Sequence, residues 1–515
     1  MKSINQLASQ FADLNTKVVS GLASGQAPND LLDQRDNLIN ELNKLIKVST
    51  NTNSNGSFNV FIGSGQQLVV GNQAMKLTAN AGSADPARIV VGLETAAGSS
   101  LELPEKLITG GELGGLIAFR SETLDRATNE LGRMAASVAL TFNAQHALGM
   151  DMLGNANGDG AAFNADFFNV GGLAPTVSAN THNTGSLTVS AQLVDPPPFG
   201  PDVNDGSYYT NLTISDYRLV FNGGTSYSLT RLSDNTTFAL TAPASMTVAS
   251  EGLSISLGAG AGVVGDSFLI QPTRNAAKNI SVNPVIAADA RALAVAVPFR
   301  TSAADSNNGN GAISAGKTVP GFDVSLLRAN DIAITYNAGV PNNLTFAGLA
   351  AGDQLTIKLP GMPEGAPISQ PFPTIAYTQG MTIAVAGMSF TLTGQPSNGD
   401  SFNLSLNSAG VADGRNALAL GQLQTKNTMV GGKATFQGAY AQMVASNGIK
   451  TRELKVTGEA QQAVLDQAQA SRDALSGVNL DEEAANLIKF QQAYQASAKL
   501  LEVGKTLFDA VLQLG

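Results

Sequence analysis

The carboxyl-terminal stretch 480–514 constrains the fold more than any other part of the sequence. Its apolar positions recur every seven residues, at Leu480, Leu487, Tyr494, Leu501 and Phe508. A second row follows the same spacing at Ala484, Gln491, Ala498, Lys505 and Leu512. A heptad sustained over about four repeats predicts a long helix that packs as in a coiled coil. Asn479 or Asp481 can cap it, and an ordinary helix of a globular bundle is the alternative interpretation.

The amino-terminal region also has a helical period. In residues 1–19 the apolar side chains lie three or four apart, at Ile4, Leu7, Phe11, Leu14 and Val18. After a loop containing Pro28, a second amphipathic helix is predicted, with Asn29 or Asp30 as its cap and one apolar face formed by Leu31, Leu38, Leu42 and Leu45. Two such helices joined by a short loop predict an antiparallel pair.

Two further helical stretches are predicted. One covers about residues 121–147, with an inward face formed by Leu124, Leu131, Met134, Val138 and Phe142. The other covers about residues 433–475, with Gly448 as a candidate break. The helical segments at the two ends must find partners, so the ends are expected to meet in one stalk.

The regions between the helices have the period of strands. Alternation of apolar and polar residues appears in 50–115, and 155–410 is rich in short strands and turns. The segment 195–206, DPPPFGPDVNDG, is predicted to be a loop because proline cannot pair in a central strand. The sequence therefore predicts a multidomain α+β protein, a helical bundle or coiled-coil stalk from both chain ends with inserted β-rich modules.

We predict four parts. Residues 1–154 hold the helical hairpin, a small β region and the third helix; 155–304 form a first β-rich module; 305–410 form a second, inserted module; and 411–515 return to the stalk. Two related modules are predicted because GLSISL and GDSFLI in the first resemble GMSFTL and GDSFNL in the second. The alternative is chance similarity between turn-rich β sequences. If the repeat is real, residues 318–408 should be removable.

Composition excludes several classes of function. The 515-residue chain has no cysteine, so disulfides, thiolate nucleophiles and cysteine metal sites are excluded. A net charge of −10 repels phosphate, so nucleic acid is not an expected partner. No apolar run approaches the roughly 20 residues of a membrane span, so membrane insertion is not expected. The polar start, MKSINQLASQFADLN, does not resemble a secretory signal with an apolar core.

We expect no catalytic, cofactor-binding or metal-binding residues. His146 and His182 are the only histidines and lack a nucleophile motif beside them, so structural or surface roles are predicted. Residues 155–166 have the spacing of a calcium loop, but Asn155 replaces the first Asp and Asp166 the final Glu. A polar turn is the preferred interpretation.

Several segments resemble the hook-associated protein 1 family of the bacterial flagellum. They are LLDQRDNLINEL at 31–42, GGELGGLIAFRSETLD at 110–125, FNAQHALGMDMLG at 142–154 with the following Phe167–Phe168 pair, and SGVNLDEEAANLIKFQQAYQASAKLLEVGKTLFDAVLQL at 476–514. The last segment resembles the terminal helix shared by flagellar axial proteins. Family members normally begin with a longer segment that carries half of the innermost helical pair, so this chain is expected to lack that segment. The second β module is also expected to be an addition.

The resemblance implies a non-enzymatic structural subunit that joins the flagellar hook to the filament. It implies hook protein, a second junction protein and copies of the chain itself as partners, with an export chaperone, and an extracellular place reached without a cleaved signal peptide. The expected assembly interface is the terminal stripe together with Ile4, Leu7, Phe11 and Leu14. Another flagellar axial protein, such as the second junction protein or flagellin, and a β-rich surface adhesin remain alternatives; a secreted hydrolase is a third class.

Overall fold

A computed structural model describes the chain except for residues 24–27, 64, 96–97, 195–207, 243–244, 351, 409, 411, 478 and 513–515. The chain divides into two compact units, Met1–Met443 and Val444–Gly515. The proline-rich segment 195–206 lies outside the described residues. Helices at both ends and antiparallel sheets between them confirm the predicted α+β class.

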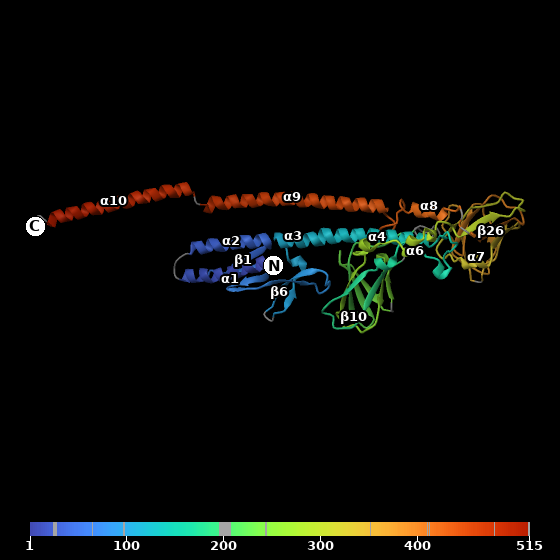
Figure 1. Cartoon of the computed structure of the whole chain (residues 1–515), viewed down its shortest axis with the longest axis horizontal. Helices are drawn as coiled ribbons and strands as arrows, with labels where there is room; N and C mark the ends of the chain where they lie inside the picture. Colours follow the sequence, from blue (N-terminus) through green and yellow to red (C-terminus); the bar gives the residue numbers. More distant parts are fainter. Residues whose placement is uncertain are drawn as a thin grey trace. The chain divides into compact units, whose positions relative to one another are not determined.

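The first domain packs two helices on a small sheet (Figure 1). Its helices are α1 (Lys2–Ala23) and α2 (Asn29–Leu45), and its first sheet has the order β1 (Val48–Thr52), β2 (Phe58–Ile62), β3 (Gln66–Val70) and β4 (Gln73–Ala74). A second sheet contains β5 (Leu77–Ala81), β6 (Ile89–Glu94) and β7 (Ser100–Glu102), and a short 3₁₀ helix follows at Glu105–Leu107. The prediction that Asn29 or Asp30 caps α2 is wrong: Pro28 precedes the helix and no side chain caps it.

Two asparagines that the apolar pattern did not single out fix α1 to the sheets. Asn15 is buried; its amide donates to the Phe58 and Gly71 carbonyls at 2.7 and 2.8 Å and its oxygen accepts from the Phe58 N–H. Asn5 exchanges a pair of 2.8 Å hydrogen bonds with the backbone of Leu77. Each side chain replaces a missing sheet partner, so the helix is held in one register over the strands.

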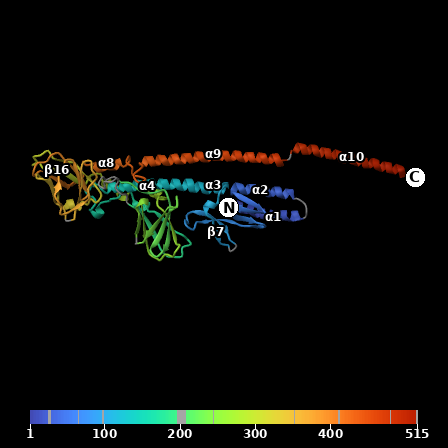
Figure 2. The same ribbon diagram turned by 180° about the vertical axis from the view of Figure 1, so that it is seen from behind.

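The third helical segment is longer than predicted. It begins at α3 (Gly111–Phe119), passes through a π-helical turn (Arg120–Leu124) and continues as α4 (Asp125–His146), and Figure 2 shows α3 and α4 following one another along one line. The predicted inward face is wrong at Leu124 and Leu131, which are exposed, whereas its other members Met134, Val138 and Phe142 are half-buried. The buried face is polar and small, at Asn129, Gly132, Ser137, Ala139 and Asn143.

Small residues face inward on α4 because the first β module approaches very closely. A Cβ at Gly132 would lie 1.7 Å from the Thr273 carbonyl oxygen, so any larger residue would force the module away from the helix. The Ser137 hydroxyl lies 2.6 Å from that of Thr210, and the Asn129 amide donates to the Ile214 carbonyl. Close backbone contact and hydrogen bonds act together with a small apolar cluster, which includes Leu140 of α4 and Leu173 and Leu212, to hold the module on α4.

The first module is a two-sheet sandwich. One sheet has the order β12 (Thr237–Thr241), β11 (Ser226–Arg231), β10 (Tyr217–Gly223), β15 (Ser267–Gln271), β8 (Thr176–Ala179); the other has β13 (Ser245–Val248), β14 (Leu253–Leu257), β9 (Val189–Leu193). Short helical turns lie at Gly160–Ala162, Val170–Leu173 and Ala249–Glu251, and α5 (Ala276–Asn279), α6 (Pro284–Ala288) and a turn at Ala290–Ala292 follow the last strand.

The second module repeats this strand order. Its first sheet runs β23 (Ile375–Ala376), β20 (Asn343–Ala347), β19 (Ile332–Asn337), β26 (Ser401–Leu406), β16 (Phe299–Ala303). Its second contains β22 (Ile368–Ser369), β21 (Gln354–Lys358), β24 (Met381–Val385), β25 (Met388–Thr393) and β17 (Ala312–Ile313), with β18 (Lys317–Thr318) also on β25. The short helix α7 (Ser325–Ala329) contacts β26 of the first sheet. The correspondence supports a true internal repeat.

The repeated GDSF motifs occupy equivalent places in the two modules. Asp266 accepts hydrogen bonds from the Val263, Thr184 and Gly185 N–H groups. Its counterpart Asp400 accepts from the Ser397, Asn308 and Gly309 N–H groups in the same way. A side chain exchanging hydrogen bonds with the next strand is also repeated, by Asn183 on Ser267 and by Asn307 on Ser401. Chance similarity does not explain a shared network of this kind.

The second module begins earlier than its motifs suggested. Strand β16 at Phe299–Ala303 pairs with β26 along its whole length, so it lies in the second module although the predicted boundary followed residue 304. Phe299 is fully buried in the core of that module, together with Phe322, Phe390 and Phe402.

Helices complete the chain. After α8 (Arg415–Gln422), α9 runs from Phe436 to Ser476 and α10 from Leu480 to Leu512. The predicted break at Gly448 is wrong, because α9 is continuous there; one glycine costs only about 1 kcal/mol in a helix. Asn479 caps α10 by accepting from the Asp481 N–H at 3.1 Å, as one of the two predicted caps.

Candidate assembly surfaces and the interdomain polar cluster

The predicted terminal stripe lies on the surface of the second unit. Its five side chains on α10 are exposed by between 61% for Leu487 and 80% for Leu480. Their spacing places them on one face of the helix, and further exposed apolar side chains widen that face at Leu500, Leu507 and Val511. Burying one leucine is worth roughly 1.5–3 kcal/mol, so this surface has a large capacity to stabilise an assembled state.

A hollow of about 720 Å³ lies within this stripe. It is lined by Ser497, Leu500, Leu501, Gly504, Lys505 and Phe508. Leu501, Gly504, Lys505 and Phe508 are related as positions i, i+3, i+4 and i+7, which is the set that forms the hole for a knob side chain in a coiled coil. A Cβ at Gly504 would meet no atom within 4 Å, so the space over this glycine is open.

The other predicted interface residues lie in the core of the first domain. Ile4, Phe11 and Leu14 are buried and Leu7 is half-buried, on the face of α1 that packs against α2 and the β1–β4 sheet. The structure therefore does not bring them to the same surface as the terminal stripe. Their periodicity was correctly interpreted as an apolar helix face, whose partner is the chain's own sheet.

The apolar pattern missed a second exposed surface on the continuous helix. Leu116, Phe119, Leu124 and Leu131 are each more than 40% exposed along α3, the π turn and α4. Leu124 and Leu131 belong to the apolar pattern of this helix, but that pattern predicted that they are buried, whereas they lie on the surface. The pattern marks an apolar face correctly but does not say whether the monomer itself covers it.

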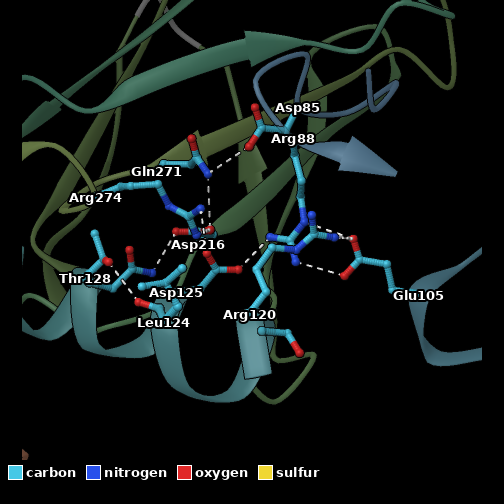
Figure 3. Close-up of polar contacts among 12 residues, drawn as sticks. Asp85, Arg88, Glu105, Arg120, Leu124, Asp125, Thr128, Asp216, Gln271 and Arg274 are labelled. Carbon is cyan, nitrogen blue, oxygen red and sulfur yellow. Dashed lines mark hydrogen bonds and ion pairs between the residues drawn. The ribbon is translucent and has the colours of Figure 1, made fainter. Parts of the chain in front are cut away.

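A cluster of charged side chains lies where the first domain meets the first β module. We call it the polar cluster; it consists of Asp85, Arg88, Glu105, Arg120, Asp125, Asp216, Gln271 and Arg274 (Figure 3). Asp125, at the start of α4, accepts from Arg88 at 2.7 Å and from Arg274 at 3.2 Å through different oxygens. Glu105 receives Arg88 through two hydrogen bonds and is also bonded by Arg120.

The deepest acid of the polar cluster is Asp216. Burial raises its pKa, while Arg274, at 2.8 Å, and the Gln271 and Asn129 amides act in the opposite direction. The residues of the polar cluster come from five separate stretches of the chain, at 85–88, 105, 120–125, 216 and 271–274, and they share no local sequence pattern. A charged cluster of this kind could be found only from the folded structure.

His146 is fully buried at the end of α4. Its Nδ1 donates to the Ala165 carbonyl at 2.8 Å and its Nε2 accepts from the Ala294 N–H at 2.9 Å, which fixes the neutral tautomer. Burial lowers its pKa, although the Ala165 carbonyl and Asp151 act to raise it. The structure places His146 in a structural role and His182 on the surface, in a turn beside Asn180.

We expect His146 to make stability depend on pH. Because its pKa is lower in the folded state than the ordinary 6.5, the folded chain binds fewer protons, and stability falls as the pH drops below about 6.5. Each unit of lowering corresponds to about 1.4 kcal/mol. Urea unfolding between pH 8 and 5.5 should show this slope in wild type and in His182→Asn, but a shallower slope in His146→Gln. Identical slopes in wild type and His146→Gln would contradict the assignment.

The side chains of the calcium-like segment 155–166 form hydrogen bonds and an ion pair with other parts of the chain. Asp159 forms two 2.7 Å hydrogen bonds with Arg328, which lower its pKa, and it also accepts from the Ala156 N–H. The Asn157 amide donates to the Phe322 carbonyl at 2.7 Å. The segment therefore connects the end of the helical domain to the second β module. The described part of the chain contains no group of three or more potential metal ligands. None of the helices in that part is long and apolar enough to cross a membrane.

Comparison with protein families matches three parts of the chain. Residues 1–163 match the profile "Flagellar hook-associated protein FlgK helical domain", and residues 199–272 match "Flagellar hook-associated protein 1, D2-like domain". Residues 471–514 match "Flagellar basal body rod FlgEFG protein C-terminal".

Similarity to individual proteins extends over nearly the whole chain. The flagellar hook-associated protein 1 of Salmonella typhimurium is 32% identical over 514 residues, which cover 99% of this chain and 69% of that protein. The Escherichia coli protein of the same name is 30% identical over 513 residues, with the same coverage. The structure of the flagellar hook junction protein FlgK from Burkholderia pseudomallei matches with a TM-score of 0.77 and 36% identity, covering 92% of this chain and 83% of that one.

These matches separate the predicted family from the alternatives. They cover the helical ends and the β-rich middle together, which neither a flagellin-like protein nor a surface adhesin would explain. The exposed helical stripe agrees with a structural function. The chain belongs to the flagellar hook-associated protein 1 family, and its role is structural, at the junction of hook and filament in the bacterial flagellum.

Proposed function

We propose that the chain joins its neighbours in the flagellum by helix packing through the terminal stripe of α10. The observation that carries the proposal is the exposure of all five heptad side chains on one helix face. Leaving so many large apolar groups in water is unfavourable for a lone subunit, and a coiled-coil partner would remove them from it. The first domain would contribute indirectly, because its buried and half-buried residues hold α1 in place. These residues are Ile4, Leu7, Phe11 and Leu14.

We further propose the hole over Gly504 as the place where a large apolar side chain of the partner helix inserts. Glycine leaves the floor of the hole empty, and Leu501 and Phe508 form apolar walls above and below it. Lys505 can extend its methylene stem along the fourth side while its charge stays in water. A large side chain inserted at this position would help to fix the register of the two helices.

The proposed partners are the hook protein, a second junction protein and further copies of this chain. Support comes from the family role and from the two separate apolar surfaces, on α10 and on α3–α4, which would allow more than one helical neighbour. An export chaperone and passage through the flagellar export channel without a cleaved signal peptide complete the proposal. The absence of cysteine supports such export, because no disulfide would need to be broken before threading.

We also propose that the chain has no enzymatic activity. Both ring nitrogens of the buried His146 are hydrogen-bonded to backbone groups. Three acids of the polar cluster, Glu105, Asp125 and Asp216, are bonded to arginines. Residues engaged in this way act in structure rather than in proton transfer.

Replacing Gly504 with alanine tests the hole directly. Alanine should stabilise the α10 helix by about 1 kcal/mol, since glycine is a poor helix former. The same methyl group should weaken assembly, because it would fill the floor of the hole. Circular dichroism of the purified chain and filament attachment in cells carrying the variant give the two readouts.

Gly458→Ala in α9 is the matched control, since that glycine also has no atom within 4 Å and lies outside the hole. It should raise helix stability and leave attachment intact. Normal attachment with Gly504→Ala would refute the hole, while leaving the broader stripe to be tested separately.

A further inference from the structure

The first domain and the first β module have separate hydrophobic cores. The core of the first domain includes Ile117 on α3, and the core under the module begins at Ala136 on α4. Within the described residues, the helix between these two positions belongs to neither cluster. We refer to residues 1–119 as the inner body and to 125–298 as the outer body.

The π-helical turn at Arg120–Leu124 lies between the two bodies. At its end the Asp125 N–H donates to the Arg120 carbonyl, five residues back, instead of the usual four. Such turns widen the helix, weaken its regular hydrogen bonding and commonly mark positions where a helix bends. The weakest point of the connecting helix therefore coincides with the gap between the cores.

Contacts across this gap are polar. Arg88 of the inner body bonds Asp125 of the outer body at 2.7 Å, and the Gln271 amide reaches Asp85 at 3.4 Å. The Thr181 N–H also donates to the Ser83 carbonyl at 2.9 Å. Arg120 fixes the start of the π turn to the inner body through the Ile89 carbonyl and Glu105. The start of the turn, at Arg120, and its end, at Asp125, are therefore linked through the Arg88–Glu105 ion pair.

The gap is also incompletely filled. A cavity of about 600 Å³ is lined from both sides, by Asp85, Arg88 and Ile89 of the inner body and by Thr176, Gln271 and Arg274 of the outer body. Of the buried side-chain nitrogen and oxygen atoms that lack a hydrogen-bond partner in the described chain, two belong to residues that line this cavity, Arg120 Nε and Arg274 Nε. A cavity of this size with polar walls has room for water molecules that could bridge the two bodies.

We propose that the polar cluster is an ionic latch that sets the angle between the inner and outer bodies, with the π turn as the hinge about which they rotate when the latch opens. Asp125 is its central residue, because among the described residues it alone accepts from an arginine of each body. Apolar cores resist rotation within each body, whereas ion pairs whose side chains are about a fifth exposed are weakened by salt and can re-form. The inference concerns the single chain and does not depend on the proposed assembly through α10.

The test measures the distance between one label on each body. Because the chain has no cysteine, Thr52→Cys in the inner body and Ala239→Cys in the outer body, both exposed, accept spin labels without further changes. Pulsed electron resonance on the full chain should give a narrow distance distribution in the otherwise wild-type protein. Asp125→Ala should broaden or shift it. At about 1 M salt, where screening acts within about 3 Å, the wild-type distribution should approach that of the variant.

Asp234→Ala is the control, since Asp234 pairs with Arg231 inside the outer body at 2.8 Å and spans no gap. It should leave the distribution narrow. If Asp125→Ala fails to fold by circular dichroism, Arg88→Gln provides the second variant, because it removes the cross-gap arm and leaves the Asp125–Arg274 pair in place. A folded Asp125→Ala or Arg88→Gln variant with the wild-type distribution would overturn the proposal.

Discussion

Replacing Leu487 and Leu501 together with aspartate should abolish attachment of the filament while leaving the subunit folded. Both side chains are exposed in the single chain, so the substitutions remove little of its own packing. In the assembled helix pair each carboxylate would lie in an apolar seam, where an unpaired buried charge costs several kcal/mol. Motility and electron microscopy of cells carrying the double variant measure the effect.

The control places the same charges on the opposite side of α10. Ala496→Asp with Ala510→Asp adds two carboxylates at positions two residues beyond Tyr494 and Phe508, outside the heptad stripe. Those cells should swim and carry filaments. The purified Leu487→Asp/Leu501→Asp chain should melt close to wild type, because the loss is in assembly. Normal filaments on cells with the stripe variant would remove the main support for the proposed interface.

Removing the second β module as residues 299–406 should leave the rest of the chain folded, whereas removing 318–408 should not. The first deletion joins Pro298 to Asn407, whose backbone groups are already hydrogen-bonded at 2.9 Å. The second leaves strand β16 without its partner β26 and exposes the fully buried ring of Phe299. It also deletes Asn407, whose amide donates to the Val297 carbonyl at the neck of the module.

Circular dichroism and thermal unfolding of the two deletion variants distinguish these outcomes. The 299–406 deletion should keep the helical signal and one cooperative transition, with some loss of stability because Met150 and Ala156 contribute to the removed core. The 318–408 deletion should aggregate or lose cooperativity, since an unpaired strand edge and an exposed aromatic ring favour association. Loss of the helical signal in both variants would show that the second module is integral to the helical domain.

Much of the architecture could be predicted from local patterns. The three-and-four spacing of Ile4, Phe11 and Val18 identified α1 and its buried face, and the heptad from Leu480 to Phe508 identified α10. The duplicated GDSF motifs identified the β repeat, because Asp266 and Asp400 each satisfy the same turn through backbone N–H groups nearby in space. Helix periodicity and turn formation depend on residues close together in the sequence, so both can be predicted from the sequence without the fold.

What the tertiary structure decided depends on neighbours far along the chain. The inward face of α4 was assigned to Leu124 and Leu131, but a module that approaches Gly132 closely selects the small and polar face instead. The strand β16 joined the second module because it pairs with β26, about a hundred residues later. The polar cluster around Asp125 brings together residues from 85 to 274 that share no local pattern. An apolar or charged helix face in the sequence indicates that some partner must pack against it. Which segment becomes that partner is decided by how the whole chain packs in three dimensions.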